Sequence, residues 1–213
     1  MHIIRKGDYR ERALKYEKTA HTYQEKLNFE YAGEYFYKAL VEWLFINEHK
    51  HALRALVELY RNSYAKICKY LLDEQWDDIP PMVENNLQGY RKMLDLVKNS
   101  EIYLEYFQYI GNTILSACQN KNIYMLSGIL IKDEYLGQLF TPLRKEILKQ
   151  LEVGYAYISS IKQKFYIEYK AVVNYVKILI HNQAIEGIIN NSETIIYTNN
   201  YVKNVIAEHL EQL

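Results

Sequence analysis

The chain has 213 residues, of which 49% are hydrophobic and 24% are charged. Its 26 basic and 26 acidic residues cancel. This balance argues against a domain devoted to nucleic acid, because such domains usually carry a basic excess. Only 3 Pro and 8 Gly are present, too few for the many tight turns of a β-sheet protein. We therefore expect an all-α fold, with residues 1–213 forming a single domain around a substantial core.

The two cysteines, Cys68 and Cys118, each fall in a helical pattern, and neither belongs to a CxxC pair. We interpret both as reduced, buried thiols of an intracellular protein. The first residues are charged and lack the apolar core of a signal peptide, and no stretch is long and apolar enough to span a bilayer. These features predict a cytoplasmic protein without a membrane span. The 22 tyrosines predict many half-buried positions.

Apolar residues spaced by three or four predict two leading helices, from about Asp8 to Lys26 and from about Phe29 to Phe45. A third, long helix is predicted to end near Glu74. The segment 73–81 follows and is the clearest internal break, since it combines acidic residues with two prolines. Pro80 and Pro81 predict extended backbone before the next helix.

The same periodicity predicts further helices as far as the C-terminus. Thr141-Pro142 is a strong helix start, because Thr caps and Pro is tolerated in the first turn. That helix is expected to continue through Gly154 to about Gln163. Ser192 is expected to cap the last helix. The predicted helices after the break carry Val83 to Val97, Tyr103 to Cys118, Ile123 to Leu130, Leu143 to Ile161, Tyr166 to Ile180 and Ile195 to Leu210. The total is about nine helices, and the β-propensity of Ile195 to Thr198 is a single short island.

Six residues of the leading hairpin resemble a known repeat: Tyr16, Ala20, Tyr23, Ala32, Phe36 and Ala39. They match the tetratricopeptide consensus, in which a 34-residue unit forms two antiparallel helices. Thr19 and Leu44 depart from it, standing where an aliphatic residue and a proline are usual. The segment 107–114 gives a second, partial match. The long, irregular helix pairs are similar to the adaptor subfamily that includes the soluble NSF attachment proteins. The resemblance implies antiparallel hairpins stacked as a right-handed repeat-like array, and an unrelated helical bundle is the alternative.

Motifs for catalysis and for metal binding are not found in the sequence. Glu48, His49 and His51 cluster, but two histidines two residues apart do not share a helix face. The sequence holds no HExxH, no GxSxG and no glycine-rich phosphate loop. We therefore expect no catalytic residue, no metal and no other cofactor, and we interpret the chain as a non-enzyme.

A basic and aromatic stretch is the one feature that would suit nucleic acid, since stacking platforms for single strands combine both residue types. It consists of Lys162, Lys164, Tyr166, Tyr169, Lys170 and Lys177. The tyrosines also continue into an apolar stripe with Val173 and Val176. We favour a buried stripe with solvated lysines opposite, and so expect no nucleic-acid partner.

The resemblance implies a groove lined by the first helix of each pair, which would expose Glu17, His21 and Gln24. Family members that hold a chaperone's C-terminal carboxylates use Lys and Asn at the places of Glu17 and His21, so that activity is not carried over. Trp76 lies in an acidic segment and either anchors a basic partner or folds onto the core while a neighbouring Asp caps the next helix. Glu17, His21, Gln24 and Trp76 are the candidate partner-binding residues.

These features predict a non-enzymatic interaction scaffold or adaptor, which binds a peptide or helix of another protein in a groove. The alternative is a helical-bundle enzyme or small-ligand-binding protein whose site forms between distant helices. A third possibility is a structural oligomer, in which the apolar helices around Val173 to Ile180 and Val202 to Leu210 pair between subunits.

Overall fold

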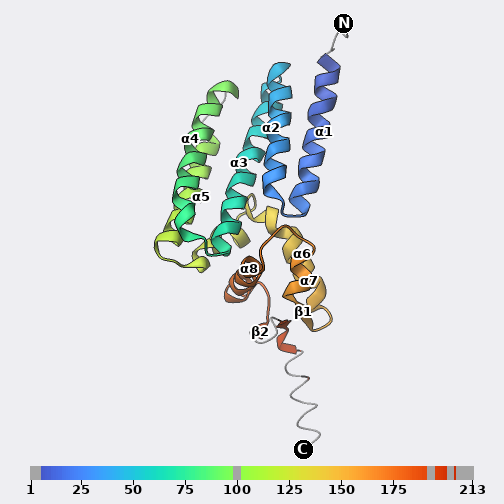
Figure 1. Cartoon of the computed structure of the whole chain (residues 1–213), viewed down its shortest axis with the longest axis vertical. Helices are drawn as coiled ribbons and strands as arrows, with labels where there is room; N and C mark the ends of the chain where they lie inside the picture. Colours follow the sequence, from blue (N-terminus) through green and yellow to red (C-terminus); the bar gives the residue numbers. More distant parts are fainter. Residues whose placement is uncertain (1–5, 98–101, 191–194, 201–203, 205–213) are drawn as a thin grey trace, which may run out of the picture.

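The computed structural model describes residues 6–97, 102–190, 195–200 and 204. Five long helices form the first part of the chain: α1 (Lys6–Glu25), α2 (Phe29–Phe45), α3 (His49–Leu72), α4 (Ile79–Val97) and α5 (Ile102–Gln119). Each packs on the next along the sequence. In Figure 1, α1, α2 and α3 lie side by side, and the α4–α5 pair flanks α3. We call these five helices the array.

The second part of the chain lies below the array in Figure 1 and mixes short helices with a small sheet. Its elements are η2 (Ile123–Leu126), η3 (Gly128–Lys132), η4 (Gly137–Phe140), α6 (Thr141–Leu151), β1 (Tyr155–Tyr157), α7 (Ile158–Lys162), α8 (Tyr169–His181), β2 (Ile188–Asn190) and β3 (Ile195–Tyr197). The all-α prediction, with about nine helices packed consecutively, is confirmed: 78% of the described structure is helical.

One turn geometry ends several helices of the chain. Leu27, Asn47, Glu74 and Lys121 all have positive φ, between 44° and 63°. In each case the next residue donates its N–H to a carbonyl five residues earlier, for example from Asn28 to Tyr23 at 2.9 Å. This is the Schellman geometry, which satisfies the last carbonyls of a helix and reverses the chain. The repeated turn explains why α1, α2 and α3 fold back on one another.

Two predictions about the start of α4 and the region after α5 are wrong. Pro80 and Pro81 lie inside the first turn of α4 instead of in extended backbone, because first-turn N–H groups have no helical partner for proline to remove. The short turn η1 (Trp76–Asp78) leads directly into them. The helix predicted over Ile123 to Leu130 is divided into the two short turns η2 and η3.

The three-stranded sheet contradicts the helices that the sequence predicts through Gly154 and from Ile195. Gly154 has φ 95°, which ends the segment after α6 and starts β1. The strand order is β1-β3-β2, all antiparallel, with Ile196 opposite both Ala156 and Ile189. The residues of β1 pair with residues about 40 positions away in β3, which a local pattern does not reveal, whereas β2 and β3 pair residues only five to nine positions apart. Ser192 and most of 202–210 lie outside the described residues.

From α6 to β3 the order is helix, strand, helix, helix, strand, strand, that of a helix-turn-helix with a β-wing. In DNA-binding proteins of this kind the second helix of the turn enters the major groove. Here that helix is α8, which packs on α3. Asn174 of α8 is 1% exposed and donates from Nδ2 to the carbonyl of Leu72 at 2.7 Å. The helix thus attaches the second part of the chain to the array.

Lys69 and an aromatic chain complete the junction between the two parts. Phe29 of α2 contacts Phe140, which stacks on Tyr175 of α8. The Lys69 ammonium donates to the carbonyl of Leu27 at 2.8 Å and to that of Tyr166. Burial lowers the pKa of Lys69 to about 8. Array and second part therefore share one core.

Candidate functional site

Two adjoining cavities along α3 form a polar depression, which we call the α3 groove. One, of about 390 Å³, is lined by His21, Gln24, Glu25, Arg61, Gln138, Leu139 and Pro142. The other, of about 290 Å³, is lined by Lys50, Leu53, Arg54, Val57, Glu58, Tyr103 and Tyr135. We name them the His21 cavity and the Lys50 cavity. They meet where Arg61 Nη1 binds Glu58 Oε1 at 2.9 Å and Arg61 Nε binds the carbonyl of Tyr135 at 2.8 Å.

A buried carboxylate, that of Glu17, holds the helices that form the wall of the groove together. Glu17 is only 4% exposed, although the sequence predicted that it would face the groove openly. One carboxylate oxygen accepts from Trp43 Nε1 at 2.9 Å, and the other accepts from Arg54 Nη2 at 2.6 Å. A buried carboxylate needs such partners to offset its loss of hydration. Glu17 therefore links α1, α2 and α3 and orients Arg54.

A chain of hydrogen bonds joins α1 to α3 in the His21 cavity. Gln24, 8% exposed, donates from Nε2 to Glu58 Oε2 at 3.1 Å. Its Oε1 lies 2.7 Å from His21 Nδ1, so Nδ1 is the donor there. The His21 ring also packs edge-on against Phe36, with centroids 5.3 Å apart. His21 is exposed as predicted, whereas Gln24 belongs to the groove wall.

The loop between η3 and η4 closes the groove from the side of the second part. Tyr106 of α5 donates its hydroxyl to Asp133 Oδ1 at 2.8 Å, and the same oxygen accepts from the backbone N–H of Tyr135 at 2.9 Å. The Arg61 guanidinium lies over the Tyr135 ring at 4.8 Å. Burial and a hydrogen bond with Tyr103 raise the pKa of Tyr135, so this phenol stays protonated at neutral pH.

Trp76, the fourth candidate, lines neither cavity. It is half-buried and packs against the core from η1, as expected if it folds back and does not present itself to a partner. The neighbouring Asp77 and Asp78 are exposed within η1. The structure thus brings Glu17, His21 and Gln24 together and leaves Trp76 apart from them.

Sequence reasoning missed Lys50, Arg54, Tyr103 and Tyr135 as groove residues. Lys50, Arg54 and Val57 are spaced by four and three, so a helical wheel of α3 would have placed them on one face. Tyr135 lies in an irregular loop, and no local pattern indicates that it reaches α3.

The basic and aromatic stretch is arranged differently from the prediction. Tyr166 and Tyr169 are 59% and 37% exposed, because α8 begins only at Tyr169 and residue 166 lies in the preceding loop. Val176 is buried as predicted. Lys164 pairs with Glu146 at 2.6 Å, and Lys170 pairs with Glu74 at 2.8 Å. Acidic partners therefore neutralise two lysines of this stretch.

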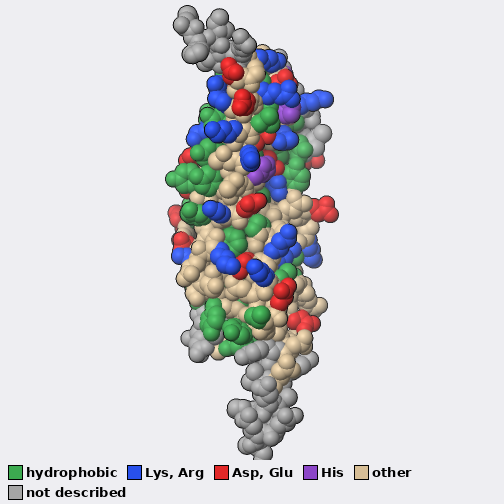
Figure 2. All heavy atoms as spheres, turned by 90° about the vertical axis from the view of Figure 1, so that its right-hand side faces the viewer, with side chains coloured by type: hydrophobic (Ala, Val, Ile, Leu, Met, Phe, Trp, Pro, Cys, Tyr) green, Lys and Arg blue, Asp and Glu red, His purple; other side chains and the backbone are tan. Residues whose placement is uncertain are grey.

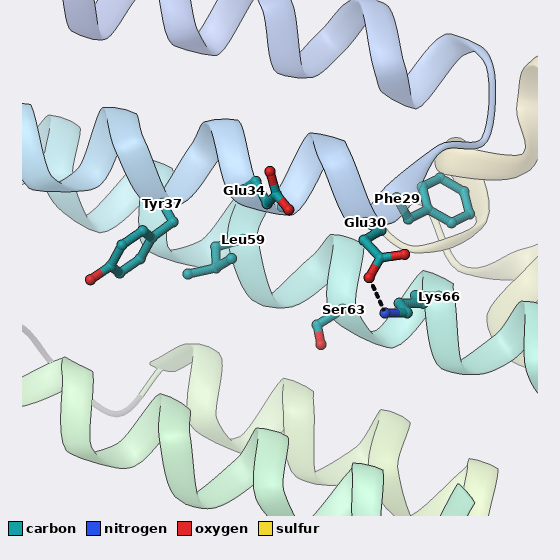
Figure 3. Close-up of a pocket in the computed structure, with 8 residues that line it drawn as sticks. Phe29, Glu30, Glu34, Tyr37, Leu59, Ser63 and Lys66 are labelled. Carbon is teal, nitrogen blue, oxygen red and sulfur yellow. Dashed lines mark hydrogen bonds and ion pairs between the residues drawn. The ribbon is translucent and has the colours of Figure 1, made fainter. Parts of the chain in front are cut away.

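A third cavity, of about 310 Å³, lies between α2 and α3 on the side of α4 (Figure 3). We call it the outer pocket. Its lining is Phe29, Glu30, Gly33, Glu34, Tyr37, Leu59, Ser63 and Lys66. Glu30 and Lys66 form an ion pair across it at 3.1 Å. Ser63 of its lining donates to Asn86 Oδ1 of α4 at 2.7 Å.

The described residues offer little for covalent or metal chemistry. No group of three His, Cys, Asp or Glu among them could hold a metal ion. Cys68 and Cys118 are both buried, as predicted. Burial raises the pKa of the Cys118 thiol to about 11, and that of Cys68 further, so neither is a ready nucleophile. None of the helices in the described part of the chain combines the length and apolar character that a bilayer crossing requires.

No protein-family model matches this chain, and no significant match was found among curated proteins or solved structures. The tetratricopeptide-like resemblance therefore stays a prediction.

Proposed function

We propose that this chain is a non-enzymatic interaction scaffold or adaptor that binds a peptide or helix of a partner protein in the α3 groove. The observation that carries the proposal is that the side chains of the groove fall into two sets. Glu17, Gln24 and Glu58 have their polar atoms engaged within the protein. Leu53, Lys50 and the tyrosines remain on the cavity surface. A preorganised wall with free apolar and polar contacts suits recognition.

The engaged carboxylates also weigh against acid–base catalysis in this groove. A general acid or base must reach the substrate directly or through one water. Glu17 is covered by Arg54 and Trp43, and both oxygens of Glu58 are held by Gln24 and Arg61. Binding is therefore the better use of these groups.

The face of the protein seen in Figure 2 favours a protein partner over nucleic acid. Figure 2 shows acidic and basic side chains interspersed over the face that includes α1 and α6. Such a mixed surface lacks the continuous positive field that phosphate backbones require. The helix α8, which stands second in the helix-turn-helix order, also packs on α3, and its Asn174 is 1% exposed.

The runner-up function is binding of a small molecule, favoured by the size of the His21 cavity. Its volume of about 390 Å³ falls in the range of ligand sites, about 300–1,000 Å³. An oligomer through the apolar residues of α8 is less favoured, since Val172, Val176 and Leu179 are buried within the chain.

A peptide selection with a matched pair of variants tests the proposal. Random short peptides displayed on phage are selected on the full chain, and the survivors are titrated by calorimetry. We expect Leu53→Trp, which fills the Lys50 cavity without adding charge, to weaken binding at least about tenfold. Gln88→Trp, on the exposed surface of α4, should leave it unchanged. Selected peptides that bind Leu53→Trp as tightly as the natural chain would contradict the proposal. So would a failure to select any peptide while a small molecule saturates the His21 cavity.

A further inference from the structure

The Lys50 cavity holds two cations one helical turn apart. Lys50 is exposed, and the Arg54 side chain is 61% exposed. Like charges at positions i and i+4 of a helix destabilise it by a few tenths of a kcal/mol. Both side chains line the same cavity as the apolar Leu53 and Val57. The spacing is therefore unfavourable for α3 alone and becomes favourable when an anion lies between the two cations.

The protein's own carboxylates do not neutralise this cavity fully. Its lining brings two positive charges, on Lys50 and Arg54, and one negative charge, on Glu58. The ion pairs of Arg54 with Glu17 and of Glu58 with Arg61 add one charge of each sign, so one positive charge stays in excess. Both oxygens of Glu17 and both oxygens of Glu58 already accept hydrogen bonds. A carboxylate from outside would thus meet cations that the interior carboxylates cannot satisfy.

Donors are also in place for a carboxylate. Arg54 contributes Nη2 to Glu17, while a guanidinium carries five N–H groups in all. Charge-assisted hydrogen bonds from arginine to a carboxylate are among the strongest in proteins. The hydroxyls of Tyr103 and Tyr135 share the cavity and hydrogen-bond with each other, which leaves one of the two O–H groups to donate to a ligand. The apolar Leu53 and Val57 suit the methylene groups that precede a carboxylate.

We infer that the Lys50 cavity recognises a Glu or Asp side chain of the partner, so that the scaffold prefers acidic peptides. Lys50 and Arg54 hold the carboxylate, and Leu53 with Val57 contacts an apolar neighbour. This assignment rests on the proposed function and adds to it the chemistry of the partner.

The test uses an acidic peptide from the phage selection and its isosteric Glu→Gln form, both amidated at the C-terminus. Lys50→Gln should weaken the acidic peptide about three- to tenfold and leave the Gln peptide unchanged. Raising the salt concentration should weaken the acidic peptide in the natural chain and have little effect in Lys50→Gln. Lys92→Gln, an exposed lysine of α4, is the matched control. Lys50 is preferred over Arg54 as the test position, because Arg54 also holds buried Glu17.

Several outcomes separate this inference from the proposed function. Peptides that lose affinity with Leu53→Trp but bind Lys50→Gln equally well would overturn the acidic preference and leave the scaffold proposal in place. Loss of all binding on C-terminal amidation, or a phosphoserine peptide that binds far better than Glu with the same Lys50 dependence, would overturn the assignment to a carboxylate side chain. If Leu53→Trp has no effect, both proposals fail.

Discussion

Lys69 gives the most quantitative prediction, because its half-buried ammonium ties the array to the second part of the chain. Its Nζ donates to the carbonyls of Leu27 and Tyr166 and lies 5.5 Å from the Phe29 ring centroid. Burial is the main cause that lowers its pKa from 10.5 to about 8, and nearby Lys66 adds to the effect. Glu168 and Glu30 oppose it.

The sign of the pH dependence follows from proton binding. Above about pH 8 the folded chain releases the Lys69 proton, whereas the unfolded chain holds it to about pH 10.5. The unfolded state therefore binds more protons, and the Lys69 contribution to the free energy of unfolding rises with pH. The slope is about 1.4 kcal/mol per pH unit. Between about pH 8 and 9.5 the expected gain is about 2 kcal/mol.

Other groups titrate in the same range, so the measurement must be a difference. Burial raises the pKa of Cys68 and Cys118, and their contribution to stability falls as the pH rises above about 9. Urea unfolding followed by circular dichroism should be compared between the natural chain and Lys69→Met. The difference in free energy of unfolding should grow by about 2 kcal/mol in favour of the natural chain over this window. Lys92→Met should give no such change. Parallel pH profiles for the natural chain and Lys69→Met would refute the reasoning.

Three further predictions concern stability and can be measured by the same urea unfolding. Glu17→Ala removes the acceptor of the buried Trp43 N–H and should lower the free energy of unfolding by about 2–4 kcal/mol. Glu17→Gln keeps an acceptor and should cost less than half as much. Equal losses for the two variants would contradict the role given to the Trp43 hydrogen bond. Tyr64→Phe should leave the free energy of unfolding unchanged or raise it, because the buried Tyr64 hydroxyl has no partner among the described residues. Tyr106→Phe should lower it by about 1–2 kcal/mol, because it removes the hydrogen bond to Asp133. Lys121→Gly should stabilise by about 1 kcal/mol, since Lys121 is exposed with φ 44°; a loss of stability would show that this backbone position does not favour glycine.

Local patterns were sufficient to predict the array. The helix predicted from Phe29 to Phe45 is found with those bounds, and the predicted first helix differs from α1 by two residues at its start and one at its end. These helices are amphipathic, and their ends are marked by short polar turns, so the signal lies within each element.

The sheet and the groove could not be predicted in the same way, because both depend on partners in other elements. Ile196 becomes a strand residue only because Ala156 and Ile189 lie opposite it. Glu17 has the spacing of a groove residue on α1, but Trp43 from α2 and Arg54 from α3 bury it. Such partners are set by packing between elements and are not encoded in any one segment.

The position of a bound peptide on α3 tests the central claim most directly. Leu53 and Val57 line the Lys50 cavity, and Leu59 of the same helix lines the outer pocket. Methyl NMR spectra of the chain, recorded with and without a selected peptide, report on all three. We predict large shifts for the Leu53 and Val57 methyl signals and none for Leu59. Shifts at Leu59 alone, or no shifts at any of the three residues, would contradict a partner site in the α3 groove.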